Sequence, residues 1–200
     1  MTFSNPELVQ TIQQVLELLG TLAFAISGIR HAAAKRYDWF GGFVCGFSVA
    51  IGGGTMTSPF YIICTILAQV LVIMFAKSLV RLNNTWLVFD TLGLAFFTIA
   101  GMQKTLAYGH PFWVAIAMGC ITGCAGGVLR DVLLNRTPEI FKKEIYAMAS
   151  IAGGLIYWLM AILHFNAGIT AIVVFFIIIT IRFLSLRYHI SLPRLKDDNE

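Results

Sequence analysis

The stretch TGCAGGVLRDVLL, residues 122–134, shares a double glycine with VAIGGGTM, residues 49–56, and both stretches lie in apolar segments. The earlier pair, Gly53 and Gly54, falls on Gly126 and Gly127 when residue i is set against residue i + 73. The same ungapped register matches Glu17 with Asp90, Leu19 with Leu92, Gly20 with Gly93, Phe24 with Phe97, Ile26 with Ile99, Gly28 with Gly101 and Gly46 with Gly119. Internal similarity of this kind indicates a duplicated membrane protein.

The composition also indicates a membrane protein. Hydrophobic residues make up 58% of the chain and charged residues 12%, against roughly 25% charged residues in an average soluble domain. The mean hydropathy is +0.81. A hydrocarbon core about 30 Å thick is crossed by about 20 apolar residues in a helix. Seven such spans are predicted, at residues 8–29, 39–55, 59–76, 86–103, 112–134, 145–163 and 167–187.

The basic residues predict how these spans are oriented. Of the 14 basic residues, 12 follow the first, third and fifth spans or lie in the end of the seventh span and the tail, Lys104 alone lies on the opposite side, and Arg130 falls within a span. Because cytoplasmic loops carry an excess of Lys and Arg, the N-terminus is predicted outside and the C-terminus in the cytoplasm. The net charge of +4 then reflects topology. It gives no support to nucleic-acid binding.

The duplication and the topology together predict the architecture. Each copy contains three spans, an odd number, so the second copy crosses the membrane in the opposite sense to the first. We therefore predict an all-α membrane protein with two inverted three-helix repeats and a seventh helix. The predicted parts are a first repeat at 8–82, a second repeat at 85–164, the seventh helix at 167–187 and a cytoplasmic tail at 188–200. Sites in such folds lie near the midplane, between the repeats.

The double glycines are the first candidate site residues. Glycine pairs favour a bend in a helix, and a bend inside a membrane frees backbone groups that must face protein or water. Gly53, Gly54, Gly126 and Gly127 are therefore predicted to form hinges or a carbonyl-lined path. The alternative is that they allow close helix packing. The two interpretations are compatible.

The ionisable residues inside the spans are the second group of candidates. Arg130 and Asp131 follow the second glycine pair, and charges at membrane depth usually face a bundle interior or an aqueous cavity. We predict a pore or gate in which Arg130 pairs with a carboxylate; the alternative is that Arg130 extends to the cytoplasmic interface. Glu17 and Asp90 are candidate cation-attracting or gating carboxylates. Alternatively, Glu17 belongs to a polar stripe that faces water or lipid headgroups.

Other functional classes find little support in the sequence. The chain has no serine-hydrolase elbow, Walker loop or HExxH motif, so no enzyme activity is predicted. The four cysteines lie in apolar segments and are interpreted as packing residues. We expect no metal site and no organic cofactor.

Two motifs resemble those of a known family. GGGT, residues 52–55, and GGVLRDVLLNRTPEIFKKEIYA, residues 126–147, are similar to the bacterial branch of the trimeric intracellular cation (TRIC) channel family. The resemblance extends from about Leu16 to Arg187. It departs from the family pattern after Thr55, where no Arg-Asp pair follows the first motif.

This resemblance implies a homotrimer in the cell inner membrane, with lipid bound to it. Each protomer would contain its own pore for monovalent cations, chiefly potassium and also sodium. The pore would pass between the repeats, lined by the second and fifth spans bent at their double glycines. Arg130 and Asp131 would form the charged element beside the second bend.

Two other functions remain open at this stage. Inverted repeats are the usual architecture of alternating access, and the same domain resembles proteins described as glycine carriers. A secondary transporter of a small solute such as glycine is therefore the alternative. A structural or lipid-organising membrane protein is the third possibility, but it gives no reason for Arg130 and Asp131 inside a span.

Overall fold

The computed structural model describes residues 6–52, 60–74, 85–141, 145–188 and 190, and all regular structure in these residues is helical. The helices are α1 (Pro6–Ala34), α2 (Trp39–Gly52), α3 (Phe60–Met74), α5 (Thr85–Ala107), α6 (Phe112–Leu133), η1 (Glu139–Phe141), α7 (Ala147–Ile162) and α8 (Ala167–Tyr188). The predicted all-α fold is confirmed. Gly53 and Gly54 lie outside the described residues.

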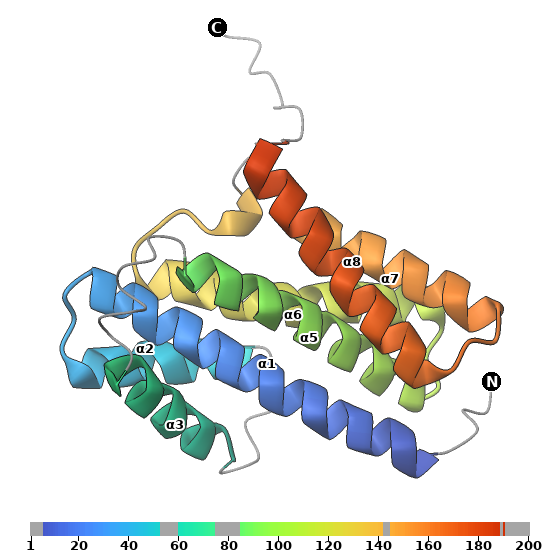
Figure 1. Ribbon diagram of the computed structural model, residues 1–200, viewed down its shortest axis with the longest axis horizontal. Coiled ribbons are helices and arrows are strands. Elements are labelled where there is room, and N and C mark those ends of the chain that lie inside the picture. Colours follow the sequence, from blue (N-terminus) through green and yellow to red (C-terminus); the bar gives the residue numbers. More distant parts are fainter. Residues whose placement is uncertain (1–5, 53–59, 75–84, 142–144, 189, 191–200) are drawn as a thin grey trace, which may run out of the picture.

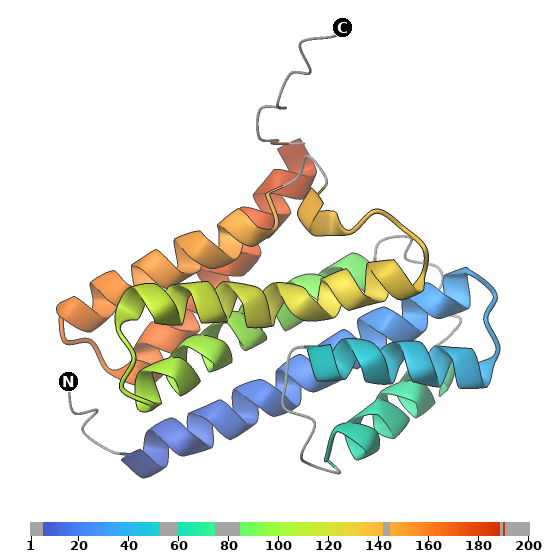
Figure 2. The same cartoon turned by 180° about the vertical axis from the view of Figure 1, so that it is seen from behind.

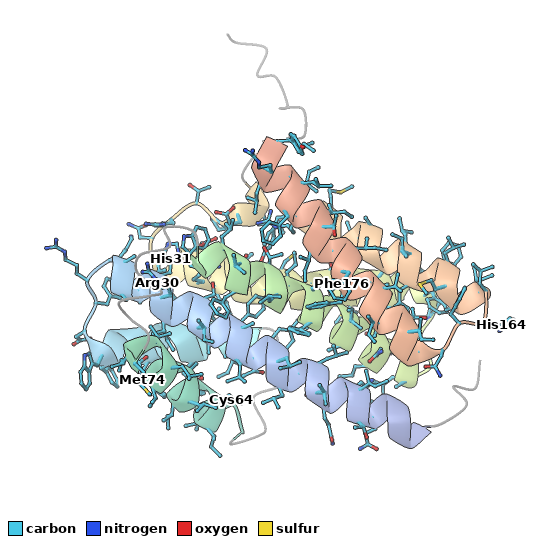
Figure 3. All side chains as sticks on the ribbon, in the orientation of Figure 1. Arg30, His31, Cys64, Met74, His164 and Phe176 are labelled. Atoms are coloured by element: carbon cyan, nitrogen blue, oxygen red, sulfur yellow. The ribbon has the colours of Figure 1, made fainter. Side chains whose placement is uncertain are left out.

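Each of the seven predicted spans corresponds to one α-helix. Segments of α1, α5, α6 and α8 are long and apolar enough to cross a membrane. The described parts of α2, α3 and α7 have 14, 15 and 16 residues, which corresponds to about 21–24 Å at a rise of about 1.5 Å per residue. Large apolar side chains cover the outside of the bundle, among them Met74 and Phe176, which are 71% and 61% exposed (Figure 3). The chain is a multi-pass membrane protein.

Two helices are longer than the apolar pattern predicted. The first span was predicted to end at residue 29, but α1 continues to Ala34 because three alanines, strong helix formers, follow His31. α5 continues to Ala107 and stops at Gly109, whose φ of 79° lies in the left-handed region. The amide of His110 then donates to the carbonyl of Thr105, which closes the helix end.

The long helices α1 and α5 lie side by side in opposite directions (Figure 1). α2 and α3 pack on α1, whereas α6 and α7 pack on α5, so the first three and the next three helices have similar neighbours. α2 also contacts α6, and both are visible from behind (Figure 2). α8 has no counterpart and packs on α7 and α5.

Identities in the duplication register occupy matching positions in the two helix triplets. A β-carbon added to Gly28 of α1 would lie 3.1 Å from the Cα of Gly46 in α2. The same contact recurs between Gly101 of α5 and Gly119 of α6, again at 3.1 Å. Each helix pair therefore crosses at two glycines, where the absence of side chains lets the backbones approach.

Candidate functional site

Three buried charged side chains meet where α6 packs against α5 and α1. Arg130 and Asp131 come from the last turns of α6, and Asp90 comes from the second turn of α5. Arg130 and Asp90 are fully buried and Asp131 is 2% exposed. Together with the buried Ser27 of α1, they form what we call the charged cluster.

Arg130 connects the other members of the charged cluster. Its Nη1 lies 2.5 Å from Asp90 Oδ1 and donates to Ser27 Oγ at 3.1 Å. Its Nε donates to Asp131 Oδ1 at 2.9 Å, and Nη2 is also 2.9 Å from that oxygen. One guanidinium thus joins α6 to α5 and to α1. Hydrogen-bonded pairing of this kind is what permits charges to be buried at all.

Trp86, at the start of α5, covers the cluster. The Arg130 guanidinium lies 4.9 Å from the centre of the Trp86 ring, a cation–π distance. The Trp86 carbonyl accepts a hydrogen bond from Ser27 Oγ at 3.1 Å. The His31 ring packs edge-on against Trp86 at 4.6 Å, near the same end of the bundle as Arg30 (Figure 3). The cluster therefore lies near the end of the bundle that is predicted to be cytoplasmic.

Asp131 also holds the segment that follows α6. Its Oδ2 accepts a hydrogen bond from the Glu139 amide at 3.0 Å, at the start of η1. Its carbonyl accepts from the Arg136 amide at 2.8 Å. Asp131 therefore links the charged cluster to the connection between α6 and α7.

The second glycine pair lies one turn before the charged cluster and is tightly packed. A β-carbon added to Gly126 would lie 2.5 Å from the Phe24 ring and 2.8 Å from the Val49 carbonyl oxygen. A β-carbon on Gly127 would lie 2.5 Å from the Tyr146 hydroxyl and 3.2 Å from Asp90 Oδ1. α6 is helical on both sides of the pair. The contacts favour close packing at these glycines, and the bend stays a prediction.

A cavity of about 440 Å³ opens toward the other end of the bundle. Its lining residues include Glu17 of α1, Phe97, Lys104 and Tyr108 of α5, and Thr122 and Ala125 of α6. We call it the α5–α6 cavity. The Lys104 ammonium lies 3.9 Å from the Glu17 carboxylate, and both side chains are partly exposed. The cavity thus carries charges of both signs.

The chain matches a family model described as a glycine transporter, over residues 14–57 and 87–161. A membrane protein of Vibrio cholerae, UPF0126, is 33% identical over 95% of this chain and 85% of its own length. The inner membrane protein YadS of Escherichia coli K12 is 34% identical over 89% of this chain and 93% of its own length.

Solved structures that resemble this chain are TRIC cation channels. A TRIC cation channel is 30% identical with a TM-score of 0.78, over 94% of this chain and 98% of that one. The TRIC trimeric intracellular cation channel orthologue of Rhodobacter sphaeroides is 26% identical with a TM-score of 0.83, over 90% of this chain and its own full length. This chain belongs to the TRIC channel family.

In this TRIC family member the structure brings together some of the predicted site residues and separates others. Arg130, Asp131 and Asp90 meet in the charged cluster, and the predicted pairing of Arg130 with a carboxylate is confirmed. The Arg130 side chain is fully buried and does not extend to the surface of the protein, and its pore or gate role stays a prediction. Glu17 lies apart, at the α5–α6 cavity. The register mates Glu17 and Asp90 therefore occupy different environments.

Sequence reasoning missed three residues that lie at or near the charged cluster. Ser27 and Trp86 bind or cover Arg130, and Tyr146 lies against Gly127. Tyr146 carried a signal, because it belongs to the family-like motif of residues 126–147. Ser27 and Trp86 carried none, since neither is charged and neither has an identical partner in the duplication register.

Proposed function

We propose that the protein is a cation channel whose path passes between the two helix triplets, with potassium as the main permeant ion and sodium as a second. The observation that carries this proposal is the charged cluster, in which a guanidinium on α6, a helix long and apolar enough to cross a membrane, joins α5 to α1. Intramembrane charges of this kind mark ion pathways and their gates. The likeness to TRIC cation channels gives independent support.

The wider arrangement belongs to the same proposal. We infer that the triplets are inverted repeats, with the N-terminus outside and the C-terminus in the cytoplasm. The Rhodobacter sphaeroides relative is a trimeric channel, and we propose a homotrimer with one pore per protomer and lipid between protomers. We also propose that Gly53, Gly54, Gly126 and Gly127 line the pore.

The charged cluster suggests how the path closes. Arg130 is bonded to Ser27, Asp90 and Asp131 and is fully buried, so a hydrated ion has no passage through this packing. Opening requires the guanidinium to move away. The two carboxylates would then face the path and attract a cation, while weak binding at several places lets it leave.

Single-channel recording tests the channel proposal. Purified protein in a planar bilayer under a potassium gradient is expected to give unitary currents that reverse near the potassium equilibrium potential. Replacing potassium by sodium on one side then measures the selectivity. Protein that is assembled but gives no unitary current in repeated reconstitutions would contradict the proposal.

The second candidate function is a secondary transporter of a small zwitterion such as glycine. The glycine-transporter family model and the Glu17–Lys104 pair of the α5–α6 cavity favour it, because an amino acid carries one charge of each sign. A transporter would show saturable glycine uptake into liposomes without unitary currents. That combination of results would select the transporter over the channel.

Asp131→Asn is expected to leave assembly intact and to change gating. An asparagine oxygen can still accept from the Glu139 amide, but the charge that holds Arg130 is lost. Because hydrogen bonds to charged groups are worth about 1.5–3 kcal/mol, we expect the open-to-closed ratio to rise by a factor of about 10 to 100. The control is Asp38→Asn, which lies in an exposed turn and caps α2 through the Gly41 amide. Unchanged currents would remove Asp131 from the site.

Glu17→Gln is expected to lower the unitary current at low salt. A carboxylate in the α5–α6 cavity raises the local cation concentration, and this effect fades as the Debye length shrinks to about 3 Å at 1 M salt. Lys104→Gln is the matched control, and its current should rise instead. Stability should change by less than about 1 kcal/mol in both, since the pair is partly exposed. If the unitary current changed in the same direction in both variants, the electrostatic role of Glu17 would be contradicted.

A further inference from the structure

Two phenylalanines of the bundle interior connect features already described, because Phe24 packs on Gly126 and Phe97 lines the α5–α6 cavity. Phe24 of α1 and Phe97 of α5 stack with ring centres 5.2 Å apart and an interplanar angle of 20°. Both side chains are fully buried. Phe24 also falls on Phe97 in the duplication register. Matching positions of the two triplets therefore carry the same residue, and their side chains contact each other.

The packing around this aromatic pair is reciprocal. A β-carbon on Gly20 of α1 would lie 2.9 Å from the Phe97 ring, and one on Gly93 of α5 would overlap the Phe24 ring. Gly20 and Gly93 are register mates as well. Each ring therefore lies over the glycine of the opposite triplet. Phe24 also covers Gly126 of α6, so the pair closes the space between α1, α5 and α6.

The aromatic pair lies between the α5–α6 cavity and the charged cluster. Phe97 is a lining residue of the cavity. On the other side, Asp90 precedes Phe97 by seven residues in α5, a rise of about 10 Å, and Gly126 precedes Arg130 by four residues in α6, a rise of about 6 Å. An ion that entered the cavity would meet the two rings before it reached Arg130.

We propose that Phe24 and Phe97 form a hydrophobic gate, separate from the Arg130 bonds and in series with them. An apolar constriction closes a pore by expelling water, because a dehydrated cation has no polar group to replace its hydration shell. Two stacked rings seal the path with no charge involved. Opening requires the rings to separate, and each ring packs on a glycine of the opposite triplet, so no side chain at that position holds it in place. This inference rests on the proposed channel function.

Truncation of the rings tests the gate. Phe97→Ala and Phe24→Ala are expected to raise the open probability by about tenfold, because the space left by the ring admits water. Phe97→Leu keeps an apolar side chain and should give a smaller rise. The open probability should therefore increase from the wild type through Phe97→Leu to Phe97→Ala. Phe96→Ala is the matched control, since Phe96 lies on the same helix but packs on Phe175 at 4.6 Å. Its currents should match those of the wild type.

The outcomes separate this inference from the channel proposal. Wild-type protein without cation currents would overturn both. A conducting wild type with Phe97→Ala and Phe24→Ala currents equal to those of Phe96→Ala would overturn the gate alone. If the alanine variants do not assemble on size-exclusion chromatography, Phe97→Leu decides, and an unchanged open probability in that variant overturns the gate.

Discussion

Arg130→Gln is expected to abolish assembly of the protein or to lower its thermal midpoint strongly. The substitution leaves Asp90 and Asp131, both buried, without the cation that bridges them. Breaking a buried ion pair by removing one partner destabilises a protein by about 3–5 kcal/mol, and here two carboxylates of like charge are left facing each other. The measurement is the thermal midpoint of detergent-purified protein, followed by size-exclusion chromatography.

Second-site variants establish the cause of that loss. Arg130→Gln combined with Asp90→Asn should recover part of the thermal midpoint, because one uncompensated carboxylate is removed. Arg130→Lys should recover less than the double variant, since an ammonium cannot bond Ser27, Asp90 and Asp131 in the fixed fork of a guanidinium. Arg187→Gln, at an exposed position of α8, is the control. An Arg130→Gln protein that melts like Arg187→Gln would show that the bridge is not structural.

Gly126→Ala is expected to have the next largest effect. The added methyl group would lie 2.8 Å from the carbonyl oxygen of Val49 in α2 and 2.5 Å from the Phe24 ring. Alanine gains up to about 1 kcal/mol in helix propensity over glycine. Overpacking costs about 1–3 kcal/mol, and a backbone carbonyl in a packed helix cannot swing away as a side chain does. We therefore expect a net loss of stability and of the α2–α6 contact.

Gly127→Ala provides an internal comparison for this prediction. Its methyl group would lie 2.5 Å from the Tyr146 hydroxyl, which Tyr146→Phe removes. The loss from Gly127→Ala should therefore be largely rescued in the Tyr146→Phe background, whereas the loss from Gly126→Ala should not. Thermal midpoints of the four variants measure this difference. Equal rescue of both glycine variants would mean that the contact with Val49 is not the cause.

The double glycines show how far a sequence pattern reaches. Their recurrence predicted a duplication of helix triplets, and other glycines of the same register, Gly28 with Gly46 and Gly101 with Gly119, make the same close contact in both triplets. What surrounds Gly126 and Gly127 was not predictable. Phe24 and Val49 are more than 70 positions away in the chain, and periodicity carries no information about such contacts.

The charged residues also show what the sequence predicts and what it leaves open. Arg130 inside an apolar span required a carboxylate partner, because an unpaired charge at membrane depth is costly. The sequence offered Asp131, Asp90 and Glu17 without distinguishing them. Folding brings the first two to Arg130 and leaves Glu17 beside Lys104 in the α5–α6 cavity. The register suggested equal roles for Glu17 and Asp90, and the packing of α6 makes them different.

Sequence alone therefore determined that this is a membrane protein built as a helical bundle, and it predicted two related helix triplets. These properties follow from local quantities, namely hydropathy over about 20 residues and identities at one register. Only the tertiary structure decided which residues meet, including Ser27 and Trp86 around Arg130 and Phe24 against Phe97. The physical reason is that these contacts join helices distant in the chain, and close packing at glycines sets which side chains come within bonding distance.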